Sequence, residues 1–424
     1  MTLTNKLANF GGIILLLLFF ANASSILAKT NVTTSSDSIL IEYLKDYGIR
    51  VNKHNNLKIL KSGREKFIDL FQQIEKAKHH IHLEYFNFRN DSIANALFEI
   101  LERKAKEGVE IRAMYDAFGN SSNNQPLKKK HIKAIREKGI EIVEFDPIKF
   151  PWINHVFHRD HRKIVVIDGR IGYTGGMNIA DYYITGLPEI GEWRDMHIRI
   201  EGDAVNDLQD IFLNMWNRCT KQDIGGNEYY PTLSISDSTQ HPNKKVAVVD
   251  RHPRKTNKAM RRIYAKAIES AENKVQIINP YFTPTRIIKK AIKKATEKGV
   301  DVEIMIPGKS DIGFTPDAAF YIANRLRKKG AKIYIYNGGF HHSKIMMVDS
   351  TYCTVGSTNL NSRSLRFDYE VNAFIFDDET TEELISIFQE DKEDSTLLTS
   401  EIYKKRSIWK KFVGWFAHLF TPFL

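Results

Sequence analysis

The amino-acid sequence predicts an α/β protein built from two similar lobes, and three observations support this fold class. Two blocks of the chain repeat each other, so that Gly108 and Gly139 of the first block recur as Gly299 and Gly330 of the second at the same spacing. In both blocks, apolar β-branched runs alternate with helix-period segments that carry Lys and Glu on one side. Both blocks then end in the motif H-x-K-x4-D, a strand, a turn and an Asn. Strands that alternate with helices are typical of mostly parallel or mixed sheets flanked by helices.

The expected elements of the two blocks follow the same order. In each block a first strand is followed by two helical segments that each lead into a further strand, and the glycines sit where a helix C-cap precedes that strand. The corresponding segments are 79–86, 105–116 and 135–146 in the first block and 273–282, 295–307 and 326–337 in the second. We therefore expect each block to fold into one lobe.

The chain of 424 residues is long enough for two domains that each have a core of their own. Its composition divides it into a signal peptide or membrane anchor (1–30), a first lobe (35–231), a polar linker (232–245), a second lobe (246–395) and a basic amphipathic tail (400–424).

The N-terminal segment predicts export. Lys6 precedes an apolar run from Phe10 to Ala21, which is nearer in length to a signal-peptide core than to a full membrane span of about 20 residues. The sequence around Asn22 fits a cleavage site, whereas continuation through Ala28 gives a segment long enough for an uncleaved anchor. Both alternatives place the two lobes on the exported face of a membrane.

Charge and cysteine usage narrow the function classes. A net charge of +11 and a pI near 9.3 point to an anionic partner, which could be nucleic acid, an acidic membrane surface or a phosphorylated substrate. Cys219 and Cys353 lie in segments that read as buried, and no C-x-x-C or His/Cys cluster accompanies them. Two buried thiols are therefore expected, and no zinc site.

The C-terminal tail favours a membrane over nucleic acid. Lys404, Lys405 and Arg406 precede SIWKKFVGWFAHLFTPFL, in which aromatic residues recur at helical spacing. A basic helix rich in Trp and Phe suits the interface of an anionic bilayer. The alternative is a terminal helix that docks on its own lobe.

The candidate catalytic residues occur as two copies of one motif. HRKIVVID supplies the first copy and HSKIMMVD the second, and an Asn follows each His after the same interval. In a strand, residues i and i+2 face the same way, so that the His and Lys of each copy project together. The candidates are His161, Lys163, Asp168 and Asn178 in the first lobe and His342, Lys344, Asp349 and Asn359 in the second.

These residue types suit transfer at a phosphodiester. Lysines and asparagines around one cleft can neutralise and bind non-bridging oxygens, so that no metal ion or other cofactor is needed. One imidazole can attack phosphorus while the other donates and accepts the proton of the leaving and incoming groups. Each imidazole needs an acceptor that holds its second ring nitrogen. Asp195 and Glu370, which open similar strands, are the expected acceptors, each for the histidine of its own lobe.

The segments HRDHRKIVVIDGRIGYTGGMNI and FHHSKIMMVDSTYCTVGSTNLNSRS resemble the paired signatures of the phospholipase D superfamily. The stretches EYFNF, EWRDMH, PYFTPT, NLNSRSL and EVN, with the Trp-containing tail, resemble bacterial cardiolipin synthases, and the similarity covers residues 38–424. The resemblance implies two pseudo-symmetric lobes with one active site at their interface, His161 as nucleophile and His342 as acid and base. It places Asp168 and Asp349 outside the reacting centre, as buried partners of loops.

The same resemblance implies a phosphatidyltransferase of phospholipid biosynthesis at the inner membrane of a bacterial cell. It would transfer a phosphatidyl group between two phosphatidylglycerols to give cardiolipin and glycerol through a phosphohistidine. The expected partners are phosphatidylglycerol and an anionic membrane surface, with no nucleic acid. Many relatives carry two membrane spans, whereas this chain has one short apolar segment. A hydrolytic phospholipase D and an exported nuclease of the superfamily are the alternatives, and two intact motifs argue against an inactive scaffold. The sequence leaves the acceptor alcohol and the oligomeric state open.

Overall fold

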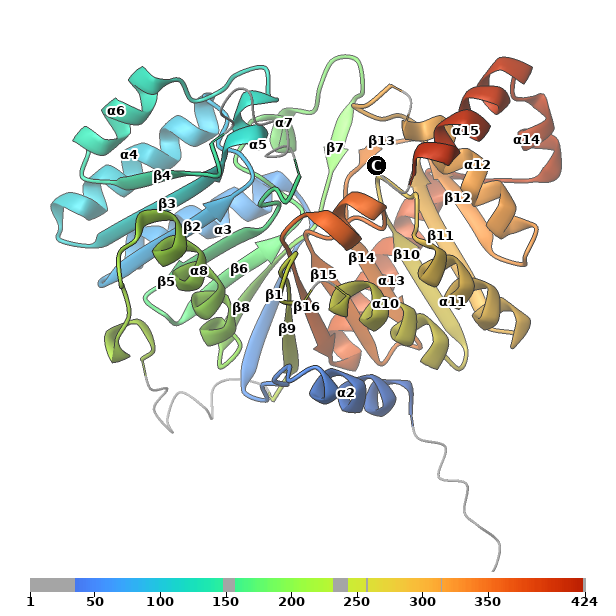
Figure 1. Cartoon of the computed structure of the whole chain (residues 1–424), viewed down its shortest axis with the longest axis horizontal. Helices are drawn as coiled ribbons and strands as arrows, with labels where there is room; N and C mark the ends of the chain where they lie inside the picture. The colour runs from blue at the N-terminus through green and yellow to red at the C-terminus, as the bar shows by residue number, and fades with distance from the viewer. Residues whose placement is uncertain (1–34, 148–156, 232–242, 257, 314, 422–424) are drawn as a thin grey trace, which may run out of the picture. The chain divides into compact units, whose positions relative to one another are not determined.

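A seven-stranded mixed sheet is the framework of the first half of the chain (Figure 1). The structure, a computed structural model, describes residues 35–147, 157–231, 243–256, 258–313 and 315–421. The expected targeting segment and most of the expected linker lie outside these ranges. In order across the sheet, the strands are β1 (Asn55–Leu60), β8 (His197–Gly202), β6 (Ile171–Gly175), β5 (Lys163–Ile167), β2 (His80–Tyr85), β3 (Glu110–Asp116) and β4 (Glu141–Phe145).

An eight-stranded sheet of the same design forms the framework of the second half. Its strands, in order, are β17 (Ser395–Leu397), β12 (Lys332–Tyr336), β11 (Asp301–Pro307), β10 (Lys274–Ile278), β14 (Ile345–Val348), β15 (Tyr352–Gly356), β16 (Glu370–Phe376) and β9 (Lys245–Arg251). In both sheets three consecutive strands, β2-β3-β4 and β10-β11-β12, pair in parallel, and all other neighbours are antiparallel. The two-lobed α/β fold with mixed sheets is confirmed, and its parallel part is limited to the repeated strand–helix units.

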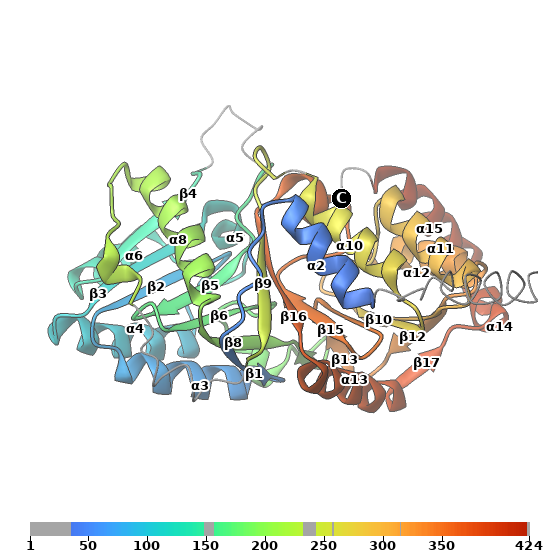
Figure 2. The same cartoon turned by 90° about the horizontal axis from the view of Figure 1, so that it is seen from below.

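Helices cover both faces of each sheet, and Figure 2 shows the two halves arranged about an approximate twofold axis. The helices α3 and α4 of the first half lie on the opposite side of the molecule from α10 and α11 of the second, and α8 lies opposite α13. The helices of the first half are α3 (Gly63–Lys76), α4 (Ser92–Lys106), α5 (Ala117–Ser121), α6 (Lys129–Glu137), α7 (Tyr182–Thr185), α8 (Val205–Thr220) and the 3-10 turn η2 (Asn227–Tyr229). Those of the second half are α10 (Ala259–Ser270), α11 (Arg286–Glu297), α12 (Thr315–Arg327), the π-turn η3 (Arg363–Phe367), α13 (Asp378–Glu393), α14 (Ser400–Lys405) and α15 (Ile408–Phe420).

The two sheets share a core at their seam. Strand β5 is buried along its whole length, and its alternate residues Ile164 and Val166 join a cluster with Met347 of β14 and Val371 of β16. Val165 instead packs in the core of the first half. The seam is also bridged by backbone pairing, because β7 (Glu192–Arg194) of the first half pairs in parallel with β13 (Gly339–His341) of the second. This pairing fixes the register of the two halves at their seam.

The half on which helix α2 (Ser36–Asp46) packs differs from the one that the expected domain boundary gave it. It was assigned by sequence to the first lobe, but Leu40 and Leu44 are fully buried in the core of the second half together with Met260 and Ile263 of α10. The apolar positions of this short helix show that it has a buried face, but the sequence did not indicate which lobe that face covers. In the described part of the chain, no helix is both long enough and apolar enough to cross a membrane.

The C-terminal helix α15 docks on its own lobe, which is one of the two alternatives considered for the tail. It docks on α12, where Gly414 approaches the backbone of Asp317 closely and Arg406 forms an ion pair with Asp317. The opposite face is exposed, since Trp409 is 69% and Phe416 49% solvent-accessible. The docked face explains how so short a helix is held, and the exposed face leaves an apolar surface in solvent.

Candidate active site

His161 is held by a clamp of buried ion pairs at the start of β5. The guanidinium of Arg159 is fully buried and lies 3.0 Å from a carboxylate oxygen of Asp116 at the end of β3. Arg162 donates to Glu84 of its own half at 3.2 Å and to Asp250 of the other half. Breaking a buried pair leaves an uncompensated charge, so that these contacts fix the backbone on both sides of the histidine.

His342 occupies the equivalent place before β14, in a more enclosed position. Its side chain is 7% exposed, against 15% for His161. The ring centroids of Trp193, Phe340 and Tyr281 lie 5.3, 5.4 and 5.9 Å from that of His342. These rings restrict the imidazole to one orientation.

Each histidine is bonded to the carboxylate of the other half, so the expectation of pairing within one lobe is wrong. Nδ1 of His161 lies 3.1 Å from both carboxylate oxygens of Glu370. Nδ1 of His342 lies 2.7 Å from Oδ2 of Asp195. The expected carboxylates are thus the ones that support the imidazoles, with the partners exchanged.

Backbone hydrogen bonds across the seam explain the exchange. The N–H of His161 donates to the carbonyl oxygen of Tyr369 at 3.0 Å, and the N–H of His342 donates to the carbonyl oxygen of Arg194 at 2.6 Å. Tyr369 and Arg194 are the residues directly before Glu370 and Asp195. Each histidine is therefore docked in register beside the strand of the opposite half that carries its carboxylate.

The surroundings keep both imidazoles neutral. Burial, followed by the charges of Lys163 and Lys344, lowers the pKa of His161 and that of His342 well below the ordinary value. Burial also raises the pKa of Asp195 to about 6 and that of Glu370 to about 7. A neutral imidazole has a lone pair available for attack on phosphorus, which an imidazolium lacks.

The motif lysines lie beneath the site rather than around it. Nζ of Lys163 donates to the carbonyl oxygen of His161 at 2.6 Å, and Nζ of Lys344 donates to the carbonyl oxygen of His342. Both side chains are buried, and neither lines the pocket. Burial lowers the pKa of Lys163 to about 7 and that of Lys344 to about 8. Their positive charges therefore act on the pocket from beneath the two histidines, without a place in its lining.

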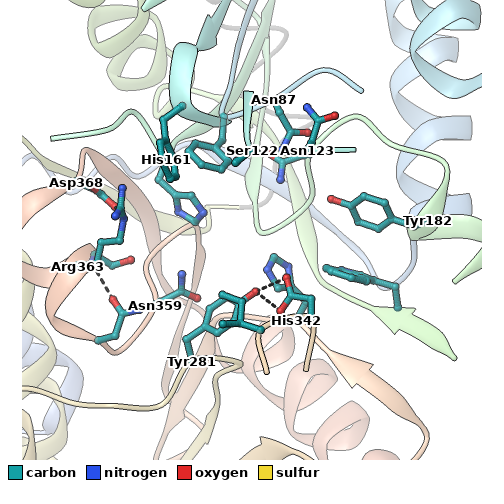
Figure 3. Close-up of a pocket in the computed structure, with 18 of the residues that line it drawn as sticks. Asn87, Ser122, Asn123, His161, Tyr182, Tyr281, His342, Asn359, Arg363 and Asp368 are labelled. Atoms are coloured by element: carbon teal, nitrogen blue, oxygen red, sulfur yellow. Dashed lines mark hydrogen bonds and ion pairs between the residues drawn. The ribbon is translucent and has the colours of Figure 1, made fainter. Parts of the chain in front are cut away.

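The two histidines open into one pocket of about 750 Å³ that both halves line. Figure 3 shows His161 and His342 directed into it from opposite sides, with Asn359 and Tyr281 beside them. The expected asparagines, Asn178 and Asn359, both line the pocket, and their buried Oδ1 atoms have no hydrogen-bond partner among the described residues. The structure thus brings both histidines, both asparagines and both supporting carboxylates together.

The motif aspartates are separated from this set. The carboxylate of Asp168 accepts the N–H groups of Lys78 and His79 at 2.8 Å and of His80 at 3.0 Å. Asp349 accepts those of Glu272, Asn273 and Lys274 at 2.7–2.8 Å. Both aspartates are half-buried and follow the far ends of β5 and β14. The prediction that Asp168 and Asp349 are catalytic residues is therefore wrong. Their contacts are the loop contacts that the family resemblance implied.

Two small residues adjust the site to carboxylates of different length. Ser357 donates its hydroxyl to Glu370. The corresponding position of the first half is Gly176, where a Cβ atom would overlap the carboxylate of Asp195. The sequence shows this difference between the TGGMN and VGSTN turns. Its role becomes apparent only from the positions of the two carboxylates.

The aromatic and charged lining was not assigned from the sequence. Phe86, Trp193 and Tyr281 belong to the stretches EYFNF, EWRDMH and PYFTPT that carried the family resemblance, and all three line the pocket. Arg363 also lines it and donates from Nε to Asp368 at 2.8 Å. Within the described ranges, no three His, Cys, Asp or Glu side chains are grouped so that they could hold a metal ion.

Comparisons with known proteins agree with this geometry. A sequence model of the family described as "Cardiolipin synthase, PLD-like domain" matches residues 70–216 and 264–392. The chain is 37% identical over 398 residues to a cardiolipin synthase of Listeria monocytogenes, covering 93% of this chain and 80% of the relative. It is 37% identical over 383 residues to a cardiolipin synthase of Oceanobacillus iheyensis, covering 90% and 78%.

Solved structures show the same fold. The crystal structure of phosphatidylserine synthase from Haemophilus influenzae superposes with a TM-score of 0.68 at 15% identity, over 91% of this chain and 99% of that one. Polyphosphate kinase from Porphyromonas gingivalis superposes with a TM-score of 0.55 at 12% identity, over 82% of this chain and 49% of that one. From the family match and the curated relatives, the chain belongs to the cardiolipin synthase family of proteins with duplicated phospholipase D-like domains.

Proposed function

We propose that this protein is a cardiolipin synthase that transfers a phosphatidyl group from one phosphatidylglycerol to another. The observation that carries the proposal is the pair of neutral imidazoles, each held at Nδ1 by a carboxylate of the opposite half and directed into one pocket. In a chain 37% identical to cardiolipin synthases over 93% of its length, this pair supports phosphodiester exchange.

The reaction takes place in two displacements. Nε2 of His161 attacks the phosphorus of the first phosphatidylglycerol, the bond from phosphorus to the glycerol oxygen breaks, and His342 gives that oxygen a proton. His342 then takes the proton from a glycerol hydroxyl of the second phosphatidylglycerol, and that oxygen attacks phosphorus. The bond from phosphorus to Nε2 of His161 breaks, and cardiolipin forms.

An asymmetry at Nδ1 supports these roles. Among the described residues, Nδ1 of His161 is bonded only to the acceptor Glu370, so that it carries the hydrogen and leaves Nε2 with the lone pair of a nucleophile. Nδ1 of His342 faces Asp195 but also lies 2.9 Å from Nζ of Lys344, which is a donor. Because Nδ1 of His342 faces a donor as well as an acceptor, the ring can carry its hydrogen on Nε2, which is the form that a general acid needs.

Product analysis tests the proposed reaction. Purified protein incubated with labelled phosphatidylglycerol should give cardiolipin and glycerol in equal amounts. Phosphatidic acid with glycerol would identify a hydrolytic phospholipase D. Cleavage of DNA or RNA with no lipid turnover would identify a nuclease.

The pH dependence of kcat/KM should be bell-shaped with a maximum near neutrality. As the pH falls, Asp195 and Glu370 become protonated at pKa values of about 6 and 7 and hold the imidazoles less well. As the pH rises, Lys163 and Lys344 lose their protons at pKa values of about 7 and 8, and the site binds a phosphate less strongly. A pH profile on micellar substrate checks this. In Lys163→Arg the alkaline limb should move to higher pH, because a guanidinium keeps its charge.

Chelators should leave the activity intact, because the lysines supply the positive charge that a phosphodiester requires. Turnover of micellar substrate in EDTA should equal turnover in buffer alone. A complete loss that one divalent cation restores would contradict the proposal. A partial loss on vesicles has another cause, since divalent cations also change the packing of anionic lipids.

We also propose that the enzyme works at the inner membrane of a bacterial cell, on its exported face. The apolar run near the N-terminus supports export. The exposed aromatic face of α15 and the basic residues around it support contact with an anionic bilayer surface.

Substitution of the exposed face of α15 should weaken membrane binding without unfolding the protein. Replacing Trp409, Phe412 and Phe416 with serine should lower the affinity for anionic vesicles by roughly 10- to 100-fold, because each side chain contributes about 1 kcal/mol or somewhat less by insertion. The melting temperature should not change, since all three side chains are at least 48% exposed. A vesicle-sedimentation assay measures this loss.

The matched control replaces Ile68 and Leu397, which are also exposed, at 53% and 45%, but lie on other elements. These changes should leave vesicle binding unaltered. A fall in melting temperature together with loss of micellar turnover in the α15 variant would show that the exposed face stabilises the second lobe instead. Deleting the whole tail from Lys404 discriminates less well, because it also uncovers α12.

A further inference from the structure

A second cavity of about 590 Å³ lies outside the catalytic pocket, between α10, the start of α11 and the end of α15. Figure 2 shows these helices together on one side of the second sheet. Segments that are distant in sequence meet there, and most of the side chains they contribute are cationic or apolar. The described lining consists of Lys258, Arg261, Arg262, Pro284, Thr285, Arg286, Ile287, Lys289, Ser362, Arg366, His418, Leu419 and Thr421.

The described lining of this basic pocket is strongly cationic. Six of its lining side chains are lysine or arginine, and among its described lining residues there is no aspartate or glutamate. Elsewhere in the second half, Lys274 and Lys392 form ion pairs with Glu303 at 3.0 Å. A cluster of cations in a pocket whose described lining includes no carboxylate favours an anionic ligand.

The cations of the basic pocket repel one another. Burial and the charges of Arg366 and Arg262 lower the pKa of Arg261. Burial and the charge of Arg325 lower the pKa of Lys289, and Lys289 in turn helps to lower the pKa of His418. An anion bound among these groups would remove the repulsion, so the pocket is arranged to stabilise a bound negative charge.

Two backbone features add donors for an anion. The helix α11 starts at this pocket, with Thr285 at its N-cap and no acidic residue in its first turn. The cap makes no side-chain hydrogen bond, and Oγ1 of Thr285 is buried without a partner among the described residues. The positive end of the α11 dipole and its free N–H groups therefore face the same space as the cations.

An exposed apolar surface adjoins the charged one. Leu419 lines the basic pocket and is 52% solvent-accessible, and Phe416 and Phe420 lie within one turn of it on α15 at 49% and 48%. A soluble anion would use the cations alone, without the exposed apolar side chains at the rim. A phosphate joined to acyl chains uses both surfaces, because its headgroup fits the pocket while its chains follow the apolar face of α15.

The basic pocket is next to the catalytic pocket but separate from it. Tyr281 and Thr283 line the catalytic pocket, and the following Pro284 and Thr285 line the basic one. Arg363 and Arg366 are divided in the same way. A lipid held here would lie beside the reacting lipids without reaching His161 or His342, neither of which lines the basic pocket.

We propose that the basic pocket binds the phosphodiester headgroup of an anionic membrane phospholipid that is not one of the two reacting molecules, and so seats the enzyme on the bilayer with the catalytic pocket beside the bound lipid. The proposal rests on the proposed function only in placing the enzyme at a phospholipid surface. The bound lipid is a fixed contact with the membrane and takes no part in the displacement at phosphorus.

The test removes three charges of the basic pocket and measures binding and turnover separately. Lys258→Gln, Arg261→Gln and Lys289→Gln are combined in a His342→Ala background, so that no turnover alters the vesicles. Binding to vesicles of phosphatidylglycerol and phosphatidylcholine, mixed at about 3:7, should weaken roughly 30- to 100-fold, because each basic residue near an anionic surface contributes about 1 kcal/mol. In the active background, the same three changes should leave turnover of micellar short-chain phosphatidylglycerol within about twofold, because the reacting groups are untouched.

The matched control removes three charges from the first half, at Lys76, Lys129 and Lys130, which are all exposed. It should change vesicle affinity less than about threefold, because exposed charges act only within roughly a Debye length. Equal losses in the two triple variants would reduce the effect to net charge and overturn the proposal. Unchanged vesicle binding in the pocket variant would also overturn it.

A competition experiment distinguishes a membrane lipid from a soluble phosphate as the ligand of the basic pocket. Glycerophosphoglycerol and inorganic phosphate at millimolar concentration should not displace the protein from vesicles, since they lack the chains that contact α15. If either binds through Lys258, Arg261 and Lys289 while vesicle affinity stays the same, the pocket is a site for a soluble anion and the lipid assignment fails. Absence of micellar turnover in the unaltered protein would instead contradict the proposed function, and the vesicle comparison would still be readable.

Discussion

His161→Ala is expected to lower kcat for cardiolipin formation by at least about 10⁴-fold, because it removes the atom that forms the bond to phosphorus. His342→Ala is expected to lower kcat by a smaller factor of about 10²–10⁴, which is the usual contribution of a general acid or base. The two variants should respond differently to the leaving group. With a phosphatidyl nitrophenyl ester, whose phenolate leaves without a proton, His342→Ala should release about one equivalent of nitrophenol in a rapid burst, and His161→Ala should release none.

Measurement of nitrophenol by absorbance before the steady state, with the ester in excess over the protein, checks the assignment. A burst in His161→Ala and none in His342→Ala would reverse the two roles. No difference between the variants would contradict the division of labour that the contacts of Lys344 with Nδ1 of His342 support.

The exchanged carboxylates give the second large effect. Glu370→Gln and Asp195→Asn should each lower kcat by about 10²–10⁴-fold, because the neutral amide does not stabilise the positive charge that the imidazole acquires during the reaction. Both residues are positioning residues, since neither lines the pocket. Because Glu370 bonds to His161, Glu370→Gln should give no burst with the nitrophenyl ester, as in His161→Ala. Because Asp195 bonds to His342, Asp195→Asn should keep the burst, as in His342→Ala.

The pattern of bursts distinguishes these roles from simple loss of stability. Pairing within one lobe would interchange the two results. The control is Glu303→Gln, which removes a buried carboxylate that bonds Lys274 and Lys392 far from the histidines. It should lower the melting temperature. The ratio of the turnover rate on the nitrophenyl ester to that on phosphatidylglycerol should stay unchanged.

The sequence predicted the parts of the molecule that depend on repetition. The duplicated strand–helix units and the equal spacing of His161 to Asn178 and of His342 to Asn359 were sufficient for the two lobes and for most of the site. Repetition signals which positions are equivalent, and equivalent positions in two halves related by a twofold axis meet at the seam.

The sequence did not predict how the two halves contact each other. The interval from His161 to Asp195 is similar to that from His342 to Glu370, and spacing along one chain does not reveal which strand passes an imidazole. The exchange follows from backbone hydrogen bonds across the seam to Tyr369 and Arg194. The place of α2 on the second half has the same cause, because an amphipathic helix shows that it has a buried face but not which surface covers it.

The lysines show a different limit. Strand periodicity placed Lys163 and Lys344 on the same side as the histidines, and the structure places their ammonium groups on the carbonyl oxygens of those histidines. Periodicity gives the direction of Cβ, whereas a long side chain can turn back to a buried acceptor. The lysines consequently tune the site from beneath it.

The central claim is that phosphorus is carried on His161 between the two displacements. The most direct test incubates His342→Ala with a phosphatidyl nitrophenyl ester labelled in its phosphate, denatures the protein at mildly alkaline pH, where the bond from phosphorus to nitrogen persists, and maps the label by mass spectrometry. The account predicts about one equivalent of phosphorus on the peptide that contains His161, and none on the His342 peptide of a parallel His161→Ala sample. Label on His342 in that second sample, or turnover of the ester by the unaltered protein with no label on either histidine, would contradict it.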